Sequence, residues 1–195
     1  MLLLRMPAED RRTRERAARQ QLIVTTARRL AEDEGWDAVT TRRLSSEIEY
    51  SQPVLYSHFT NMDELAKAVA LEGFGELTEK LHTARAGATT TTDALRRVAH
   101  GYVDFAWESP ALYDAMFIRA TSLHFAAEDT PPELAAAFSE LREVVAAIAE
   151  HRDADTLTEV LWSALHGLVS LSRTRRLRPG LDADRVNLLV NLLAP

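Results

Sequence analysis

The sequence contains no cysteine, and this absence excludes a disulfide scaffold, a zinc–thiolate site, an iron–sulfur cluster and a cysteine nucleophile. Long hydrophobic runs are absent as well. The first six residues form too short an apolar run for the core of a signal peptide, and no later stretch approaches the ~18 apolar residues of a membrane span. We therefore expect a soluble, cytoplasmic protein that does not associate with membranes.

Glycine is scarce, with seven in the whole chain, and no glycine-rich loop that cradles phosphate is present. The Gly-x-Ser-x-Gly and His-Glu-x-x-His motifs of hydrolases and metalloproteases are missing too. Glu79 and His82 form a single Glu-x-x-His pair, whereas a carboxylate-bridged di-iron bundle requires two such pairs and further glutamates. The sequence therefore predicts a protein that is not an enzyme and that has no cofactor and no metal site.

The charge is unevenly distributed along a chain whose formal net charge is −6. Residues 11–29 carry seven arginines against a single acid, Glu15. Because salt screens charges over roughly 10 Å, such a local patch can attract phosphate groups even when the whole chain is acidic. An arginine-rich helix face that is simply solvated explains the same pattern.

Helix signals recur throughout the sequence, and no strand signal is found. The expected helices cover residues 12–34, 41–48, 52–58, 61–81, 93–108, 110–124, 133–151, 153–172 and 182–193. Expected N-caps include Thr40, Ser51, Asn61 and Thr92, and Asn61 with Glu64 resembles a capping box. The sequence thus predicts an all-α fold of about nine helices.

The two short helices at 41–48 and 52–58 follow a longer helix, which is the arrangement of a helix-turn-helix unit. Apolar residues four apart on each of them are expected to lock the pair: Leu44, Ile48, Leu55 and Phe59. The second short helix would expose small, polar and aromatic groups of the kind that contact base edges and phosphates in a major groove. Helical corners of this shape also occur in proteins that bind no DNA.

The residues themselves resemble a known family. The runs Thr40–Ile48 and Ser51–Phe59, followed by Asp63-Glu64-Leu65, are similar to the tetracycline-repressor (TetR) family of regulators. Its most specific marks are Gly35 five residues before Thr40 and the Leu-Tyr-x-His-Phe string at 55–59. The resemblance implies a DNA-binding domain with a basic N-terminal arm at residues 1–60, and a helical effector-binding and dimerisation domain at 61–195. In the second domain, Trp162-x-x-x-His166-Gly167 resembles the branch with a Trp-His-Gly signature.

The resemblance implies residue roles at the positions that match. DNA contacts are expected from Thr40, Thr41, Arg42, Arg43, Gln52, Pro53, Val54, Tyr56, Ser57 and His58. Two departures bear on this expectation. Glu49 stands where the family usually has glycine in a turn of positive φ, which costs a side chain roughly 1 kcal/mol. Met62 stands where the family commonly has a lysine that reaches phosphate.

Two further sets of residues complete the expectations. Residues 157–171 are apolar around nearly the whole helix, so this helix is either central in one subunit or shared across a two-fold axis. The resemblance favours a homodimer interface formed by Leu161, Leu165, Leu168, Val186, Leu189, Val190 and Leu193, with Leu188 and Leu192 on a flank. The aromatic middle helices are either core or a pocket for a small hydrophobic effector, with candidates Trp107, Tyr113, Phe117 and His166.

Together these features predict a homodimeric DNA-binding transcriptional regulator, a repressor that an effector releases from a palindromic operator of double-stranded DNA. The alternative is a helical ligand-binding or protein-interaction module with weakened DNA binding, which Glu49 and Met62 keep open.

Overall fold

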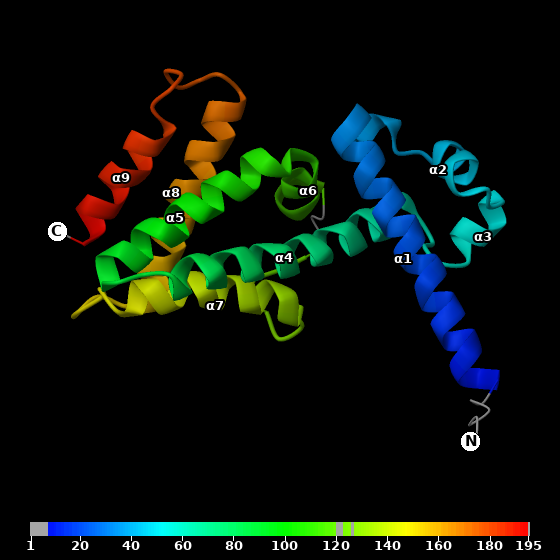
Figure 1. Ribbon diagram of the computed structural model, residues 1–195, viewed down its shortest axis with the longest axis horizontal. Coiled ribbons are helices and arrows are strands. Elements are labelled where there is room, and N and C mark those ends of the chain that lie inside the picture. Colours follow the sequence, from blue (N-terminus) through cyan, green and yellow to red (C-terminus); the bar gives the residue numbers. More distant parts are fainter. Residues whose placement is uncertain (1–7, 120–122, 126, 195) are drawn as a thin grey trace.

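The computed structural model describes residues 8–119, 123–125 and 127–194. Within these ranges the chain forms nine α-helices and no strand, which confirms the predicted all-α fold (Figure 1). A 3₁₀ turn at Trp36–Ala38 and a π-helical segment at Ala115–Arg119 complete the described secondary structure. The helices are α1 (Ala8–Glu34), α2 (Thr41–Ile48), α3 (Gln52–Tyr56), α4 (Met62–Ala86), α5 (Thr91–Glu108), α6 (Pro110–Asp114), α7 (Pro132–Ala146), α8 (Ala154–Arg173) and α9 (Asp182–Leu193).

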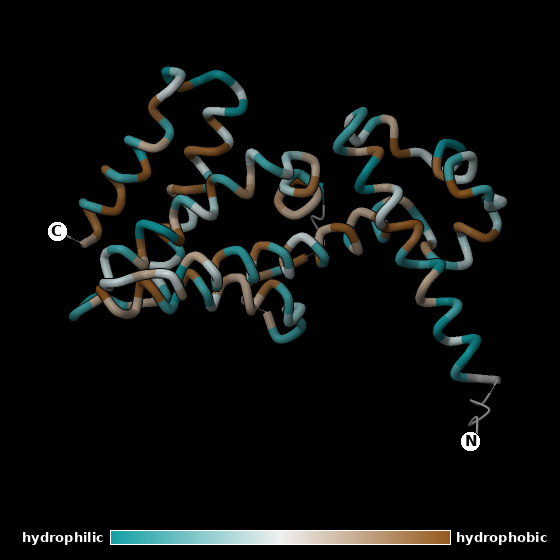
Figure 2. The backbone as a smooth tube through the Cα atoms, in the orientation of Figure 1, coloured by the Kyte–Doolittle hydropathy of each residue, from teal (hydrophilic) through white to brown (hydrophobic). Residues whose placement is uncertain are grey.

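Helix α1 has two parts with different surroundings. Residues 10–22 are exposed, and the N-terminal end of the helix extends away from the rest of the molecule (Figure 1) as a largely hydrophilic segment (Figure 2). Burial begins at Ile23 and continues at Ala27 and Leu30, the spacing of one helix face. The helix ends before Gly35, whose φ of 84° requires glycine. Residues 1–7 of the predicted basic arm lie outside the described residues.

Two of the predicted N-caps are confirmed by hydrogen bonds. The side chain of Thr40 accepts a 3.2 Å bond from the backbone N–H of Arg43. Asn61 accepts a 2.8 Å bond from the N–H of Glu64, whose carboxylate in turn accepts one from the N–H of Thr60. Ser51 precedes α3 as predicted, but its side chain makes no capping hydrogen bond.

The cap of α5 differs from the prediction. Thr90, and not Thr92, accepts the bond from the N–H of Asp93, and the carboxylate of Asp93 accepts one from the N–H of Thr89. Residues 89–92 are all threonine, so the cap chemistry is available at several positions. Thr90 is the cap because Asp93 lies three residues after it, which is the spacing of a capping box.

Other helix ends also differ from the prediction. Helix α4 continues to Ala86, beyond the expected end at Leu81, and α7 ends at Ala146 before the expected His151. The predicted helix 110–124 is α-helical only to Asp114 and then becomes the π-helical segment. In that segment Met116 packs so closely on α4 that a Cβ at Gly73 would lie 2.6 Å from its sulfur. The predicted end near His124 follows residues 120–122, which lie outside the described ranges.

Helix α4 connects the N-terminal helices to the remainder of the fold. It packs against α1 as well as against α5 and α7, and Figure 1 shows it running between the two groups of helices. The ion pair of Arg28 with Glu76 and the hydrogen bond of Gln21 to Glu72 fasten α1 to it. The predicted domain boundary at residues 60 and 61 falls directly before α4 and stays a prediction.

Candidate functional site

Helices α2 and α3 form the helix-turn-helix unit that the sequence predicted. Leu44, Leu55 and Phe59 are buried and Ile48 is half-buried, so the expected apolar residues lock the two helices together. The turn between them places Glu49 at φ 56° and ψ 31°, in the left-handed region. The glycine-like backbone is therefore formed even though this position carries a side chain.

The residues predicted for the front of α3 are accessible. Gln52 and Pro53 are exposed, Val54 is half-buried, and Tyr56 keeps 50% of its surface exposed. Ser57 is exposed, and its hydroxyl donates a 2.7 Å hydrogen bond to the carbonyl of Val54. These side chains belong to one short helix, and they offer donors, acceptors and apolar contacts to a groove.

His58 is fixed beside α3 in a less exposed position. Its Nδ1 atom is buried and has no hydrogen-bond partner among the described residues. Burial lowers the pKa of His58, and the positive charges of Arg16 and Arg19 lower it further. The ring is therefore neutral at neutral pH, so that it can donate one N–H to a phosphate but brings no positive charge.

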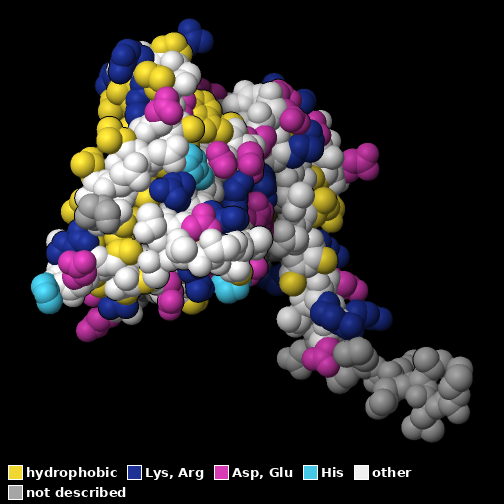
Figure 3. Space-filling view, turned by 60° about the vertical axis from the view of Figure 1, so that its left-hand side comes forward, with side chains coloured by type: hydrophobic (Ala, Val, Ile, Leu, Met, Phe, Trp, Pro, Cys, Tyr) yellow, Lys and Arg dark blue, Asp and Glu magenta, His cyan; other side chains and the backbone are white. Residues whose placement is uncertain are grey.

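A hydrogen bond joins the exposed part of α1 to the end of α3. The guanidinium of Arg16 in α1 donates a 3.0 Å bond to the carbonyl of Ser57 at the end of α3. This bond places the exposed, arginine-bearing part of α1 beside α3. In Figure 3 the extended end of α1 stands clear of the body and carries Lys or Arg side chains.

The arginines at the start of α2 differ in their partners. Arg43 pairs with Glu34 at 2.9 Å and with Glu47 at 3.1 Å. Arg42 is exposed, and within the described chain no ion pair or side-chain hydrogen bond engages it. Thr40 is exposed and Thr41 is half-buried, and both directly precede Arg42 in the chain. Arg42 is thus free to bind phosphate, whereas Arg43 must first exchange its carboxylate partners.

Three of the four predicted effector-pocket residues lie together in the interior. The hydroxyl of Tyr113 lies 2.7 Å from Nδ1 of His166, and the ring of Phe117 lies 4.7 Å from that of Tyr113 between centroids. Trp107 is not part of this group. It is 46% exposed at the end of α5 and lines a separate hollow beside the loop after α8.

Sequence reasoning missed two members of the interior group, Tyr102 and Trp162. The indole N–H of Trp162 donates a 3.0 Å bond to the hydroxyl of Tyr102, which lies 3.0 Å from the hydroxyl of Tyr113. The bonds therefore run in a chain from Trp162 to His166. Trp162 stands in the Trp-His-Gly signature, but nothing in the sequence shows that its indole meets Tyr102 or that the hydroxyl of Tyr102 meets Tyr113.

Burial controls the protonation of the side chains that form these hydrogen bonds. It raises the pKa of Tyr102 and of Tyr113 well above their usual value, and it lowers the pKa of His166. All three groups are therefore neutral at neutral pH. The nearest charges, Arg173 and Asp114, pair with each other at 2.7 Å, so the interior site presents neutral polar atoms within an aromatic wall.

The side chains of this aromatic wall leave almost no free space. A cavity of about 10 Å³ lies between α4, α5, α7 and α8, which is roughly the volume of one water-sized probe. Rings that fill the region include Phe74, Tyr102, Phe117, Phe125, Phe138 and Trp162. Admission of a ligand requires at least one of these rings to move.

Four of the seven predicted dimer residues fall on the inner side of the last two helices. Leu161, Leu165, Val186 and Val190 are at most 1% exposed, so they pack in the core of a single protomer, and a contact of theirs with a partner stays a prediction. The half-buried members of the set are Leu168, Leu189 and Leu193. The accessible apolar side chains are Val160, Leu171, Leu188 and Leu192, which range from 40% to 70% exposed.

Three of these exposed residues, Leu171, Leu188 and Leu192, line a broad apolar groove between α8 and α9. Its volume is about 400 Å³, and Leu168, Leu171, Leu188, Leu189 and Leu192 line it. Gly167 also lines it, and a Cβ built there would meet no atom within 4 Å. The open face therefore combines Leu188 and Leu192, predicted as a flank, with Leu168 and Leu189 of the predicted interface.

Within the described ranges, no cluster of three or more His, Asp or Glu side chains is arranged to hold a metal ion. The described helices also include none that is long and apolar enough to cross a membrane.

Comparisons with known proteins agree with both halves of this structure. Residues 23–69 match the family described as bacterial regulatory proteins, tetR family, and residues 95–192 match the tetracyclin repressor-like C-terminal domain.

Two curated relatives are HTH-type transcriptional regulators. Rv0681 of Mycobacterium tuberculosis is 28% identical over 86% of this chain and 75% of its own. YobS of Bacillus subtilis is 31% identical over 51% of this chain, and the match spans about half of its length, 52%. Among solved structures, PfmR, a TetR family transcriptional regulator of Thermus thermophilus, is 18% identical with a TM-score of 0.61, covering 88% of this chain and 96% of its own. That similarity shows a shared fold.

Proposed function

The chain belongs to the TetR family of DNA-binding transcriptional regulators, and on this basis we propose that it is a homodimeric repressor that an effector releases from a palindromic operator. The observation that carries the proposal is the recognition helix. Gln52, Pro53 and Tyr56 are exposed on α3 while Leu55 and Phe59 hold the helix in place.

Residues around α3 divide into those that read bases and those that hold the backbone of DNA. Gln52, Pro53 and Val54 at the front of α3 enter the major groove, where an amide can bond base edges and apolar groups can meet a thymine methyl. Phosphates are held by Thr40, Thr41, Arg42, Arg43, Tyr56, Ser57 and His58. The phosphate contacts fix the register of the helix, and the base contacts determine the sequence.

Two copies of the chain are joined through the exposed apolar groove between α8 and α9. An apolar surface of this kind is costly to leave in water, and Gly167 lets two helix backbones approach each other closely. Two-fold symmetry places two recognition helices about one turn of DNA apart, roughly 34 Å, which matches a palindromic site.

The effector binds among the interior aromatic rings. Since the polar atoms there belong to neutral Tyr102, Tyr113 and His166, and the adjacent Arg173 and Asp114 compensate each other, a neutral and largely apolar molecule fits best. One hydroxyl or carbonyl of such a molecule can take the place of a side-chain partner in the series of hydrogen bonds that runs from Trp162 to His166.

Binding at this site is transmitted to DNA through α6. Tyr113 belongs to α6 and Phe117 to the π-helical segment that directly follows it. The N-terminus of α6 is bonded to Glu32 of α1, and the indole N–H of Trp36 donates a 2.8 Å bond to the carbonyl of Ala111. Movement of Phe117 to admit a ligand therefore displaces the contact between α6 and α1. The DNA-binding helices of the two subunits then change their spacing and no longer fit the two halves of one operator.

The proposal is tested by selecting duplexes from a random pool with the purified protein and measuring their binding by fluorescence anisotropy across a salt series. We expect a palindromic consensus, with affinity that falls steeply as salt rises. Tyr56→Phe removes one hydroxyl beside α3 and should weaken binding. The matched change Ser139→Ala, at an exposed position of α7, should not. Transcription in vitro from a promoter that contains the selected site should fall when the protein is added.

Equal and weak binding to selected and random duplexes would contradict the proposal. It would favour a helical ligand-binding or protein-interaction module, in which Glu49 and Met62 have weakened the reading of DNA. Rising transcription would retain DNA binding but make the protein an activator.

A further inference from the structure

Most arginines in the described part of the chain bond a carboxylate, a side-chain amide or a backbone carbonyl. Those for which no such side-chain bond is found there are Arg12, Arg19, Arg42, Arg175, Arg176 and Arg178. The first three belong to α1 and α2, in the part of the chain that the proposed function places against DNA. The other three lie together in the loop between α8 and α9, far along the chain from the recognition helix. In Figure 3 Lys or Arg side chains stand among hydrophobic ones at the top of the molecule, where this loop lies.

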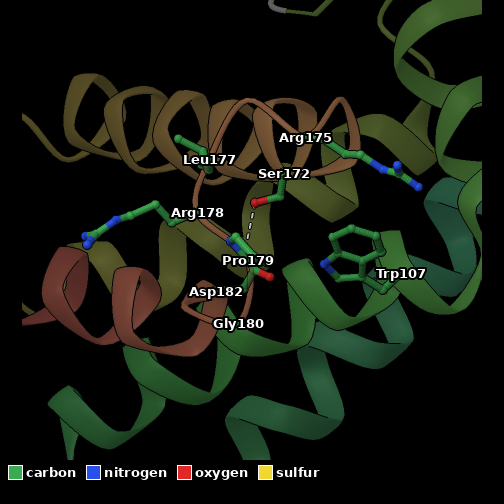
Figure 4. A pocket seen from close by; sticks show the side chains of 8 residues that line it. All are labelled: Trp107, Ser172, Arg175, Leu177, Arg178, Pro179, Gly180 and Asp182. Carbon is green, nitrogen blue, oxygen red and sulfur yellow. Dashed lines mark hydrogen bonds between the residues drawn. The ribbon is translucent and has the colours of Figure 1, made fainter.

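The loop borders a hollow of about 310 Å³ that is distinct from the interior aromatic group and from the apolar groove. Trp107 forms one side of it, Arg175 and Arg178 line it at opposite ends with their side chains directed outward, and Pro179 and Gly180 complete the loop side (Figure 4). The volume lies at the lower end of the range for small-molecule pockets, about 300–1,000 Å³.

The backbone presents Arg175 at a position that normally belongs to glycine. The N–H of Arg175 donates to the carbonyl of Ser172, and the N–H of Arg176 donates to that of Leu171, both at 2.9 Å. These two bonds form a Schellman motif at the end of α8, in which the residue of positive φ is commonly glycine. Arg175 adopts φ 56° there, so its guanidinium is carried on a rigid and uncommon backbone at the rim of the hollow.

The acidic group in the hollow does not oppose an anion strongly. The carboxylate of Asp182 accepts a 2.6 Å bond from the hydroxyl of Ser172 and pairs with Arg185 at 3.1 Å, and Figure 4 shows the first of these bonds across the floor. Helix α9 begins at Asp182, and its N-cap residue Leu181 provides no side-chain cap. Asp182 and Asp184 in the first turn offset the positive end of the helix dipole, so the attraction for an anion comes from the arginines.

We propose that this hollow is a second ligand site, which takes an aromatic phosphate ester of the size of a nucleoside monophosphate. The flat ring stacks on the exposed indole of Trp107, and the phosphate binds the guanidinium of Arg175. A planar guanidinium suits phosphate because it donates two parallel hydrogen bonds. This site is independent of the proposed operator and effector sites, and its test does not involve DNA.

The test uses the full chain labelled with 5-fluorotryptophan, whose three fluorine resonances report on Trp36, Trp107 and Trp162. Trp107→Phe assigns the Trp107 resonance by its disappearance. Adenosine 5′-monophosphate should shift this resonance in a saturable manner and leave the other two unchanged. Adenosine, which lacks the charge, and inorganic phosphate, which lacks the ring, should each bind at least tenfold more weakly.

Arg175→Gly supplies the discriminating variant, because glycine keeps the Schellman backbone and removes the guanidinium. We expect its affinity for adenosine monophosphate to fall at least tenfold, while Arg12→Gln, which removes an exposed arginine of α1, leaves it unchanged. The proposal is overturned if the nucleotide does not shift the Trp107 resonance, if Arg175→Gly binds as well as the parent, or if the other two resonances shift equally. A Trp107 resonance that responds to protein dilution and not to nucleotide would assign the hollow to contact between copies.

Discussion

The carboxylate of Glu32 in α1 accepts a 2.9 Å hydrogen bond from the backbone N–H of Leu112 in α6, 80 residues further along the chain. Its other oxygen accepts a 3.0 Å bond from the N–H of Ala111. One acidic side chain of the N-terminal helices thus caps the first turn of a helix that leads into the aromatic interior. The cap satisfies two N–H groups that have no partner within α6.

We expect Glu32→Ala to lower the free energy of unfolding by about 1–3 kcal/mol, because it leaves these partly buried N–H groups without an acceptor. Urea unfolding followed by circular dichroism measures the change. Glu79→Ala, at an exposed position of α4, serves as the control and should change the free energy by less than about 0.5 kcal/mol. Equal effects of the two substitutions would show that the contact between α1 and α6 contributes little to stability.

Glu49→Gly should stabilise the protein by about 1 kcal/mol, since glycine adopts a φ of 56° without the clash that a Cβ causes. The matched change Glu159→Gly, in the exposed middle of α8, should destabilise it by about 1 kcal/mol. Thermal unfolding of the two variants gives the comparison. If both lower the melting temperature, Glu49 makes a contact that outweighs its backbone strain.

Neutralising Arg42 should weaken operator binding more than neutralising Arg43. Arg42 is exposed without a carboxylate partner in the described structure, whereas Arg43 must leave Glu34 and Glu47 before it can bind phosphate. For Arg42→Gln we expect the slope of log K against log salt to flatten by roughly one unit. Arg43→Gln should flatten it less, and a larger effect of Arg43 in the same anisotropy series would reverse this assignment.

The stability of the protein should fall as the pH is lowered below neutral, in part because of His166. Burial lowers the pKa of His166 in the folded state, so the unfolded chain, with a histidine pKa near 6.5, takes up the proton first. The stabilisation is therefore complete above about pH 6.5 and is lost as the pH falls through the folded pKa.

His166→Gln should flatten the dependence of unfolding free energy on pH between about 5 and 7, whatever its effect on stability at pH 7. Identical curves for His166→Gln and the parent protein would mean that His166 is as readily protonated in the fold as in the unfolded chain.

The sequence predicted helices well where a cap and a breaker delimit them. Thr40 and Asn61 cap as expected, and Gly35 ends α1, because these effects act within a few residues. The helix-turn-helix was predictable for the same reason. The chain of bonds through Tyr102 and Trp162 was not, because it depends on which hydroxyl meets which indole across different helices.

The proposed dimer face shows a different limit of sequence reasoning. Residues 157–171 are apolar around almost the whole helix, so periodicity cannot tell which side faces the protomer's own core. Packing of α8 against α7 and α5 decides it, and Leu161 and Leu165 turn inward while Val160 and Leu171 stay outside. The same selection buries Val186 and Val190 of α9 and exposes Leu188 and Leu192.

Leu188→Glu and Val190→Ala separate the two faces of α9 by experiment. Leu188 is 60% exposed beside the apolar groove, so a carboxylate there should prevent the approach of a partner and yield a folded monomer in sedimentation equilibrium. Val190 is fully buried, and its truncation should cost about 2 kcal/mol of stability through lost burial and the cavity left behind, while the oligomeric state persists. If Val190→Ala dissociates the protein and Leu188→Glu does not, the subunits meet through the inner face, and α9 must detach from its own core to form the dimer.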